Sequence, residues 1–186
     1  MSNEEMVPLK DAQDQVRKTA IRLALIHLGF SKVLVDEFGE EKAKELVIKS
    51  MVEYGKLVDK HQQWDNLPYY GLHEKHSYKN QEYEDARNIP LTEGESFDYA
   101  KLKVYGCEIG KTFIDLDEEE LGRLYCYVDA SKSMAEDPSK KLIHSDCILC
   151  GDGHCSFKLE PTSEKEQADF QANNVDWKAV DPILNK

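Results

Sequence analysis

The sequence predicts an α+β fold, in which N-terminal helices pack on a small antiparallel sheet that includes a C-terminal β-hairpin. Two observations support this prediction. Apolar residues recur at helical spacing in the first third of the chain. Further on, two segments of strand-forming residues lie on either side of Asp152-Gly153, a strong turn signal. The 186 residues are enough for one domain, and a 40% apolar share is typical of globular proteins.

Two helices are expected before residue 62. Five residues of the first helix, over residues 9–29, share one face: Ala12, Val16, Ala20, Leu23 and His27. Gly29 is expected to end this helix. The second begins at Glu40, and its apolar residues recur every three or four positions up to His61. Both faces are interpreted as core, and both histidines as structural residues rather than ligands.

Residues 64–96 show no stable period and predict a loop. It is much longer than most connections in compact domains. It contains five aromatic residues: Trp64, Tyr69, Tyr70, Tyr78 and Tyr83. The loop is therefore expected either to form a lid over a site or to wrap irregularly around the core. Residues 97–106 then predict a strand.

A third helix is expected from Asp117 to Glu136, with Asp117 as its N-cap. Cys126 and Asp129 are three residues apart, so they lie side by side on this helix. The other residues of their face are small: Gly122, Ala130 and Ser133. Two reactive side chains with small neighbours leave room for a ligand to approach.

The predicted hairpin joins residues 141–149 to residues 154–160. A two-residue turn at Asp152-Gly153 would pair Cys150 with Cys155 and Ile148 with Phe157. Both faces would then carry polar and apolar groups, so the hairpin is expected to line a site. The domain is expected to span residues 1–160. Residues 161–186 are more polar and predict a C-terminal extension, lying along the domain or at the subunit interface of a homo-oligomer.

Charge and cysteine content narrow the class of protein. A formal net charge of −12 argues against nucleic acid or an anionic membrane as partner. The first residues carry no secretory signal, and the longest apolar stretch, around residues 21–30, is too short to span a bilayer. A cytoplasmic protein is therefore expected. In that compartment the five cysteines serve packing, metal binding or catalysis rather than disulfides.

Three motifs resemble those of a known enzyme family. They are Tyr105-Gly106-Cys107, then Leu121-Gly122 with Cys126 three residues before Asp129, then Gly151-Asp152-Gly153-His154-Cys155-Ser156-Phe157. In this order and spacing they resemble the L-2-amino-thiazoline-4-carboxylic acid hydrolase family. The last motif is also similar to the ending of 4-vinyl reductase domains, which are small-molecule-binding α+β modules. The specific match covers about a third of the chain.

The resemblance implies a hydrolase that opens a small sulfur- and nitrogen-containing ring at an amidine-like carbon. A cysteine thiolate can attack that carbon, or a carboxylate or histidine can activate water directly. The candidate catalytic residues are Cys107 or Cys126 as nucleophile, Asp129 as base or orienting group, and His154 or His144 as proton carrier. His144, Cys155 and Phe157 are the expected substrate-binding residues.

The chain departs from the family on the first strand of the hairpin. The family has Arg-Thr-x-Thr there, and this chain has His144-Ser145-Asp146-Cys147. Arginine suits a substrate carboxylate because it binds that group through two hydrogen bonds. The difference therefore concerns the substrate more than the fold.

Two alternatives remain open. Cys147 and Cys150 have the spacing of a zinc knuckle, and Cys155 could join them at a zinc or iron–sulfur centre. Against a metal, strand alternation would send Cys147 and Cys150 to opposite faces. No cofactor is therefore the first expectation. The second alternative is a non-catalytic domain that senses a small molecule or metal through the same residues.

Overall fold

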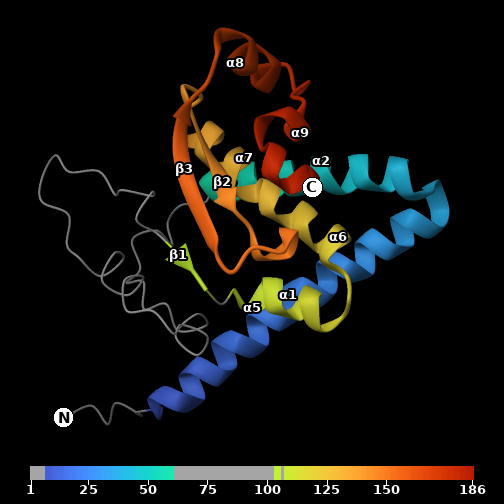
Figure 1. Cartoon of the computed structure of the whole chain (residues 1–186), viewed down its shortest axis with the longest axis vertical. Coiled ribbons are helices and arrows are strands. Elements are labelled where there is room, and N and C mark those ends of the chain that lie inside the picture. Colours follow the sequence, from blue (N-terminus) through green and yellow to red (C-terminus); the bar gives the residue numbers. More distant parts are fainter. Residues whose placement is uncertain (1–6, 61–102, 106) are drawn as a thin grey trace, which may run out of the picture.

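The computed structural model describes residues 7–60, 103–105 and 107–186, and within them the predicted α+β class is confirmed (Figure 1). The first two helices are α1 (Leu9–Phe38) and α2 (Glu40–Lys60). The antiparallel sheet has the order β1-β3-β2, with strands β1 (Lys103–Val104), β2 (Lys140–Asp146) and β3 (Cys155–Pro161). Loop 64–96 and most of the expected strand 97–106 lie outside the described residues.

Helix α1 is longer than the sequence indicates. Gly29 lies inside it, and the prediction that this glycine ends the helix is wrong. A glycine inside a helix costs about 1 kcal/mol relative to alanine, which the residues on both sides outweigh here. The helix ends where Gly39 adopts a φ of 76° and donates its N–H to Val35 O at 2.9 Å. Such a φ favours glycine.

Residues 107–136 form several short helices instead of the single helix expected from Asp117. They are α5 (Glu108–Asp115), α6 (Glu119–Gly122), the 3₁₀ turn η3 (Arg123–Cys126) and α7 (Tyr127–Glu136). Cys107 caps α5 by accepting a hydrogen bond from Gly110 N at 3.5 Å. Asp117 is not an N-cap but has a φ of 54° in the turn between α5 and α6. The chain turns back here so that Phe113 packs directly against Gly122.

The hairpin register also differs from the prediction. Phe157 pairs with His144 rather than Ile148, with an irregularity after that pair. Residues 148–150 form a 3₁₀ turn (η4, Ile148–Cys150), so Cys150 and Cys155 are not a strand pair. The physical reason is the Asp152 carboxylate, which accepts a hydrogen bond from Cys147 N at 2.9 Å and stabilises a longer connection. The two-residue turn at Asp152-Gly153 is therefore wrong.

The C-terminal residues belong to the same core as the rest of the domain. After α8 (Glu164–Gln171) come the short helix α9 (Trp177–Val180) and the 3₁₀ turn η5 (Pro182–Asn185). Trp177, Val180 and Leu184 are buried with side chains of α1, α2, α7 and the sheet. In the part of the chain that the structure describes, no helix combines the length and apolar character needed to cross a bilayer.

Candidate functional site

Three cysteines from different parts of the fold meet beside the sheet. Cys126 ends η3, Cys147 follows β2 directly, and Cys155 begins β3. The thiols of Cys126 and Cys155 both lie within hydrogen-bonding reach of the Cys147 sulfur. We call these three residues the cysteine cluster. Cys147 and Cys155 are buried, and Cys126 is half-buried.

The cysteine cluster favours one negative charge. The hydrogen bonds from Cys126 and Cys155 lower the pKa of Cys147 well below the ordinary thiol value, and the nearby His144 lowers it further. The hydrogen bond to Cys147 raises the pKa of Cys126 and of Cys155, and burial adds to both effects. Among the three thiols, Cys147 is therefore the one whose thiolate form these contacts favour.

A buried carboxylate holds His144 next to this thiolate. His144 Nδ1 lies 2.8 Å from Asp181 Oδ2, and the His144 backbone N–H donates to the same oxygen at 3.0 Å. The other ring nitrogen, Nε2, lies 3.7 Å from Asp129 Oδ2. Phe157 covers the imidazole with a ring-centroid distance of 4.8 Å. His144 and Asp181 are 2% and 0% exposed, so both are buried.

The surroundings of His144 favour its charged form. Burial lowers the pKa of His144, but the hydrogen bond with Asp181 and the charges of Asp129 and Asp181 raise it more. The net result is a pKa above the ordinary histidine value. The charge of His144 acts electrostatically on the Cys147 sulfur, so the two groups favour an imidazolium and a thiolate in each other's presence.

The structure brings most of the predicted site residues together. The carboxylate of Asp129 acts electrostatically on both Cys126 and His144. Cys107, at the start of α5, lies within electrostatic reach of Cys155.

His154 lies in different surroundings. Its ring stacks on Tyr105 at 5.2 Å, and its Nε2 lies 3.9 Å from Asp146 Oδ2. His144 is therefore the histidine placed beside the cysteine cluster.

Two residues of this site have no catalytic role in the sequence-based prediction. Cys147 enters it only as an alternative metal ligand, and Asp181 does not enter it at all. Asp181 lies between the apolar Val180 and the apolar segment Pro182–Leu184. An acidic residue among apolar anchors indicates a carboxylate with a buried partner, since a buried charge needs one. That signal could have identified Asp181.

The structure bears on the metal alternative as well. The chain does turn at residues 148–150, so the strand alternation that argued against a knuckle is absent. Nevertheless, among the described residues no three His, Cys, Asp or Glu side chains are arranged to hold a metal ion. The thiols instead surround the sulfur of Cys147.

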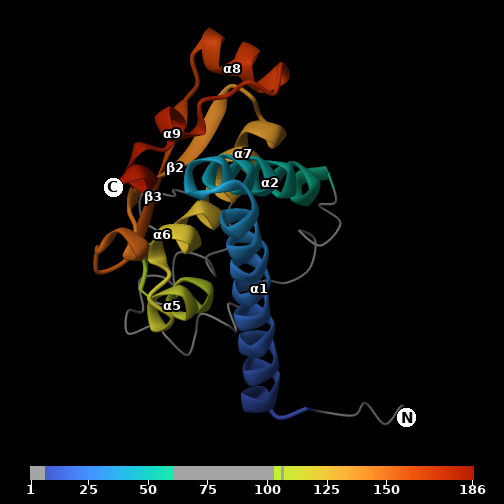
Figure 2. The same cartoon turned by 90° about the vertical axis from the view of Figure 1, so that its right-hand side faces the viewer.

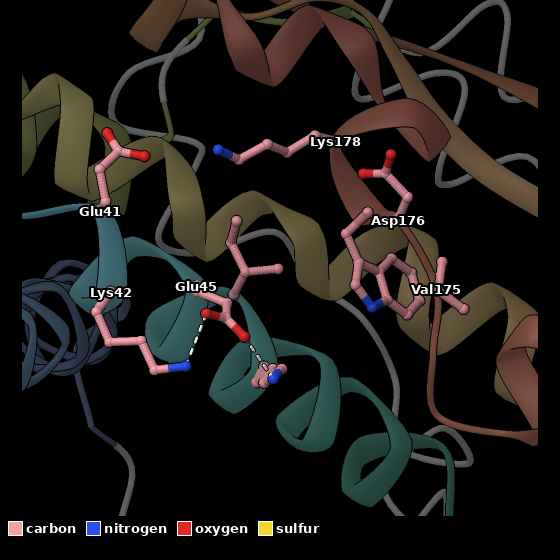
Figure 3. Close-up of a pocket in the computed structure, with 9 residues that line it drawn as sticks. Glu41, Lys42, Glu45, Val175, Asp176 and Lys178 are labelled. Atoms are coloured by element: carbon pink, nitrogen blue, oxygen red, sulfur yellow. Dashed lines mark hydrogen bonds and ion pairs between the residues drawn. The ribbon is translucent and has the colours of Figure 1, made fainter.

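A separate cavity of about 510 Å³ lies between α2 and the segment before α9 (Figure 3). Three of its charged side chains pair with one another: Glu45 contacts Lys42 at 2.8 Å and Lys49 at 2.7 Å. The hydrogen bonds from these lysines lower the pKa of Glu45 to about 2, so the carboxylate stays ionised. The cavity does not include the cysteine cluster.

No family model, curated protein or solved structure matches the chain.

Proposed function

We propose that this protein is a hydrolase that cleaves a C–N or C–S bond at the amidine-like carbon of a small heterocycle, with a cysteine thiolate as nucleophile. The observation that carries the proposal is the buried Asp181–His144 pair beside the thiolate of the cysteine cluster. A nucleophile, a proton carrier and an orienting carboxylate are the three parts that covalent catalysis needs. The resemblance of the motifs around Cys126 and Cys155 to the thiazoline hydrolases supports the same reaction class.

In this proposal Cys126 is the attacking sulfur. It is the half-buried member of the cluster, whereas Cys147 is fully buried. Transfer of the Cys126 proton to Cys147 moves the thiolate to the position that a substrate can reach. The new C–S bond forms at the amidine-like carbon. As the ring bond from that carbon to nitrogen or sulfur breaks, the imidazolium of His144 donates its proton to the departing atom.

The second half of the reaction restores the enzyme. The neutral His144 accepts a proton from water, which attacks the same carbon and releases the Cys126 thiolate. The sum is the addition of one water across the broken ring bond. Asp181 holds the imidazole in place and stabilises its charged form. The side chain of Asp129 is 39% exposed, so its carboxylate can accept hydrogen bonds from the amidine nitrogens of the substrate.

Two probes test this proposal: 2-aminothiazoline with and without the 4-carboxylate. We expect the wild-type protein to add one water to a probe, read by mass spectrometry. Cys126→Ser and His144→Asn should each lower kcat/KM by about 10³-fold or more. Cys107→Ser is the matched control, because serine also caps a helix and should keep α5 intact. Its kcat/KM should stay within about threefold of wild type.

Alkylation by iodoacetamide gives a readout that does not depend on the probe. We expect one cysteine of the Cys126–Cys147 pair to react much faster than Cys107 at pH 7, because only a thiolate is nucleophilic. Uniformly slow thiols would contradict the proposed nucleophile and favour the non-catalytic binding domain. An active Cys126→Ser variant together with an inactive Cys107→Ser variant would assign the nucleophile to Cys107.

A further inference from the structure

Helix α1 carries a second apolar face that the described part of the chain leaves exposed. Four large side chains on it are 42–72% exposed: Leu23, Ile26, Phe30 and Val33. Their spacing of three, four and three residues is that of the contact positions in a coiled coil. The side of α1 that packs into the protein's own core is different and contains Ala24 and Leu28. We call the four exposed residues the α1 stripe.

The α1 stripe forms one wall of an apolar groove of about 410 Å³, and α2 forms the other wall with residues such as Val47 and Met51. The two serine hydroxyl groups in this groove are bonded to their own helices: Ser31 donates to His27 O at 2.8 Å and Ser50 to Leu46 O at 2.9 Å. The hydroxyl groups of Tyr54 and Tyr125 hydrogen-bond to each other. The groove therefore presents a largely apolar surface. Such a surface suits the apolar face of a helix.

The charged residues beside the α1 stripe indicate which helix binds it. Arg22 and Asp36 are exposed on the same side of α1 as the stripe, and neither forms an ion pair with another described residue. They lie symmetrically about Gly29, seven residues before it and seven after it. If a second α1 packs antiparallel on the first with Gly29 at the two-fold axis, Arg22 of each copy meets Asp36 of the other. A parallel pair would hold these charges about 21 Å apart along the axis.

The apolar residues are symmetric about residue 28, one residue from the centre of the charges. In the register set by the charges, Ile26 is therefore offset from Phe30 of the second copy by two residues, about 3 Å along the helix axis, and Leu23 is offset equally from the second copy's Val33. Both pairs stay within contact distance for large side chains, and each contact occurs twice. At the axis Gly29 faces Gly29. An added Cβ at Gly29 would meet no atom of the described residues within 4 Å, so among them this position is open to close approach by another backbone.

We infer that the α1 stripe is the interface of a two-fold symmetric dimer, in which the α1 helices of two copies pack antiparallel. The interface is isologous, because the same residues of both copies form it. Figure 2 shows that α1 extends away from the sheet, so its length is presented at one side of the described fold. This inference does not depend on the proposed hydrolase activity.

A charge-swap experiment tests the inference with the full chain. Sedimentation equilibrium should show a dimer for the wild type at concentrations of about 10–100 µM. Ile26→Asp should raise the dimer dissociation constant by about 100-fold or more, because it places a charge against Phe30 twice. Arg22→Glu and Asp36→Arg should each raise it about tenfold, because each replaces two attractions with two repulsions. The double variant R22E/D36R should return it to within about threefold of wild type.

The control is Leu159→Asp, a charge placed on an apolar residue of β3 that is 46% exposed and lies outside the stripe. It should leave the dissociation constant unchanged. Circular dichroism should show wild-type helicity for every variant, because all the substituted side chains are exposed. A monomeric wild type at 100 µM or a fully dimeric Ile26→Asp variant would overturn the inference. Failure of the double variant to restore the dimer would overturn the antiparallel register.

Discussion

Asp181 connects the C-terminal segment to the chemistry of the site. One of its oxygens accepts hydrogen bonds from both the ring and the backbone of His144. A carboxylate with no exposed surface is costly unless its charge is balanced. The pair meets this requirement because the pKa of His144 is raised and the ring can hold a positive charge. The negative charge of Asp181 therefore favours the protonated form of His144.

Asp181→Asn tests this dependence. Asparagine can place its carbonyl oxygen where Oδ2 lies and keep both hydrogen bonds, but it carries no charge. The pKa of His144 should then fall below its wild-type value. Burial lowers this pKa, and the variant no longer has the Asp181 charge that opposes the effect of burial. Titration of the imidazole by NMR measures the change. An unchanged pKa would mean that Asp181 does not control His144.

The same pair makes stability depend on pH. A histidine whose pKa is raised in the folded state stabilises that state fully below its unfolded pKa of about 6.5, and the contribution disappears as pH rises through the folded-state pKa. The free energy of unfolding of Asp181→Asn should therefore differ most from wild type at and below about pH 6.5. Urea unfolding across this range checks the sign. Asp181→Ala, which also removes the hydrogen bonds, should cost about 3 kcal/mol or more there.

The packing of α2 against α7 positions the site at the level of elements, because α7 carries Asp129 and directly follows Cys126. The two helices approach closely at Gly55. An added Cβ there would lie 2.8 Å from Ser131 Cβ and 2.9 Å from Val128 O. Ser131 strengthens the contact by donating to Val52 O at 2.6 Å. The two helices are therefore too close at this crossing for any residue other than glycine.

Gly55→Ala should therefore destabilise the protein by about 1–3 kcal/mol, although alanine is the better helix former. The Val128 oxygen belongs to the backbone, so it cannot move aside without shifting α7. Chemical denaturation measures the loss. Gly153→Ala is the control, because a Cβ at Gly153 would meet no atom of the described residues within 4 Å, and its effect should stay within about 0.5 kcal/mol. Equal effects of the two substitutions would contradict the close crossing.

At the scale of the whole molecule, residues 161–186 complete the core. Leu184 is 1% exposed, and Trp177 and Val180 are buried beside side chains from the N-terminal helices and the sheet. Asp181 belongs to the same segment, so the residues that close the core also supply the carboxylate that holds His144. Stability and site geometry are therefore coupled through the C-terminus.

Leu184→Ala should lower the free energy of unfolding by about 2–5 kcal/mol, through lost burial and the cavity that it leaves. Leu159→Ala is the matched control, because Leu159 is a leucine 46% exposed on β3, and it should cost less than about 1 kcal/mol. Urea titration should show a lower midpoint for Leu184→Ala only. A small effect of Leu184→Ala would mean that this segment does not share the core.

Periodic and strand-forming patterns in the sequence predict the helices and strands that depend mainly on neighbouring residues. The apolar period from Glu40 predicts α2 closely, because one face of that helix is buried. The strand-forming segments predicted at residues 141–149 and 154–160 overlap all but one residue of each of β2 and β3. The motifs also point to the region where Cys126, Asp129, His144 and Cys155 come together.

The remaining features depend on contacts between distant residues. The register of the hairpin follows from a hydrogen bond between Cys147 and Asp152, and the break after α5 from packing of Phe113 on Gly122. Neither contact produces a periodic pattern in the sequence from which it could be predicted. The sequence by itself therefore determined the fold class, the second helix and the cysteine-containing region. Only the tertiary structure decided that Cys147 is the central sulfur and that Asp181 orients His144, because both roles depend on burial and on charges brought together by folding.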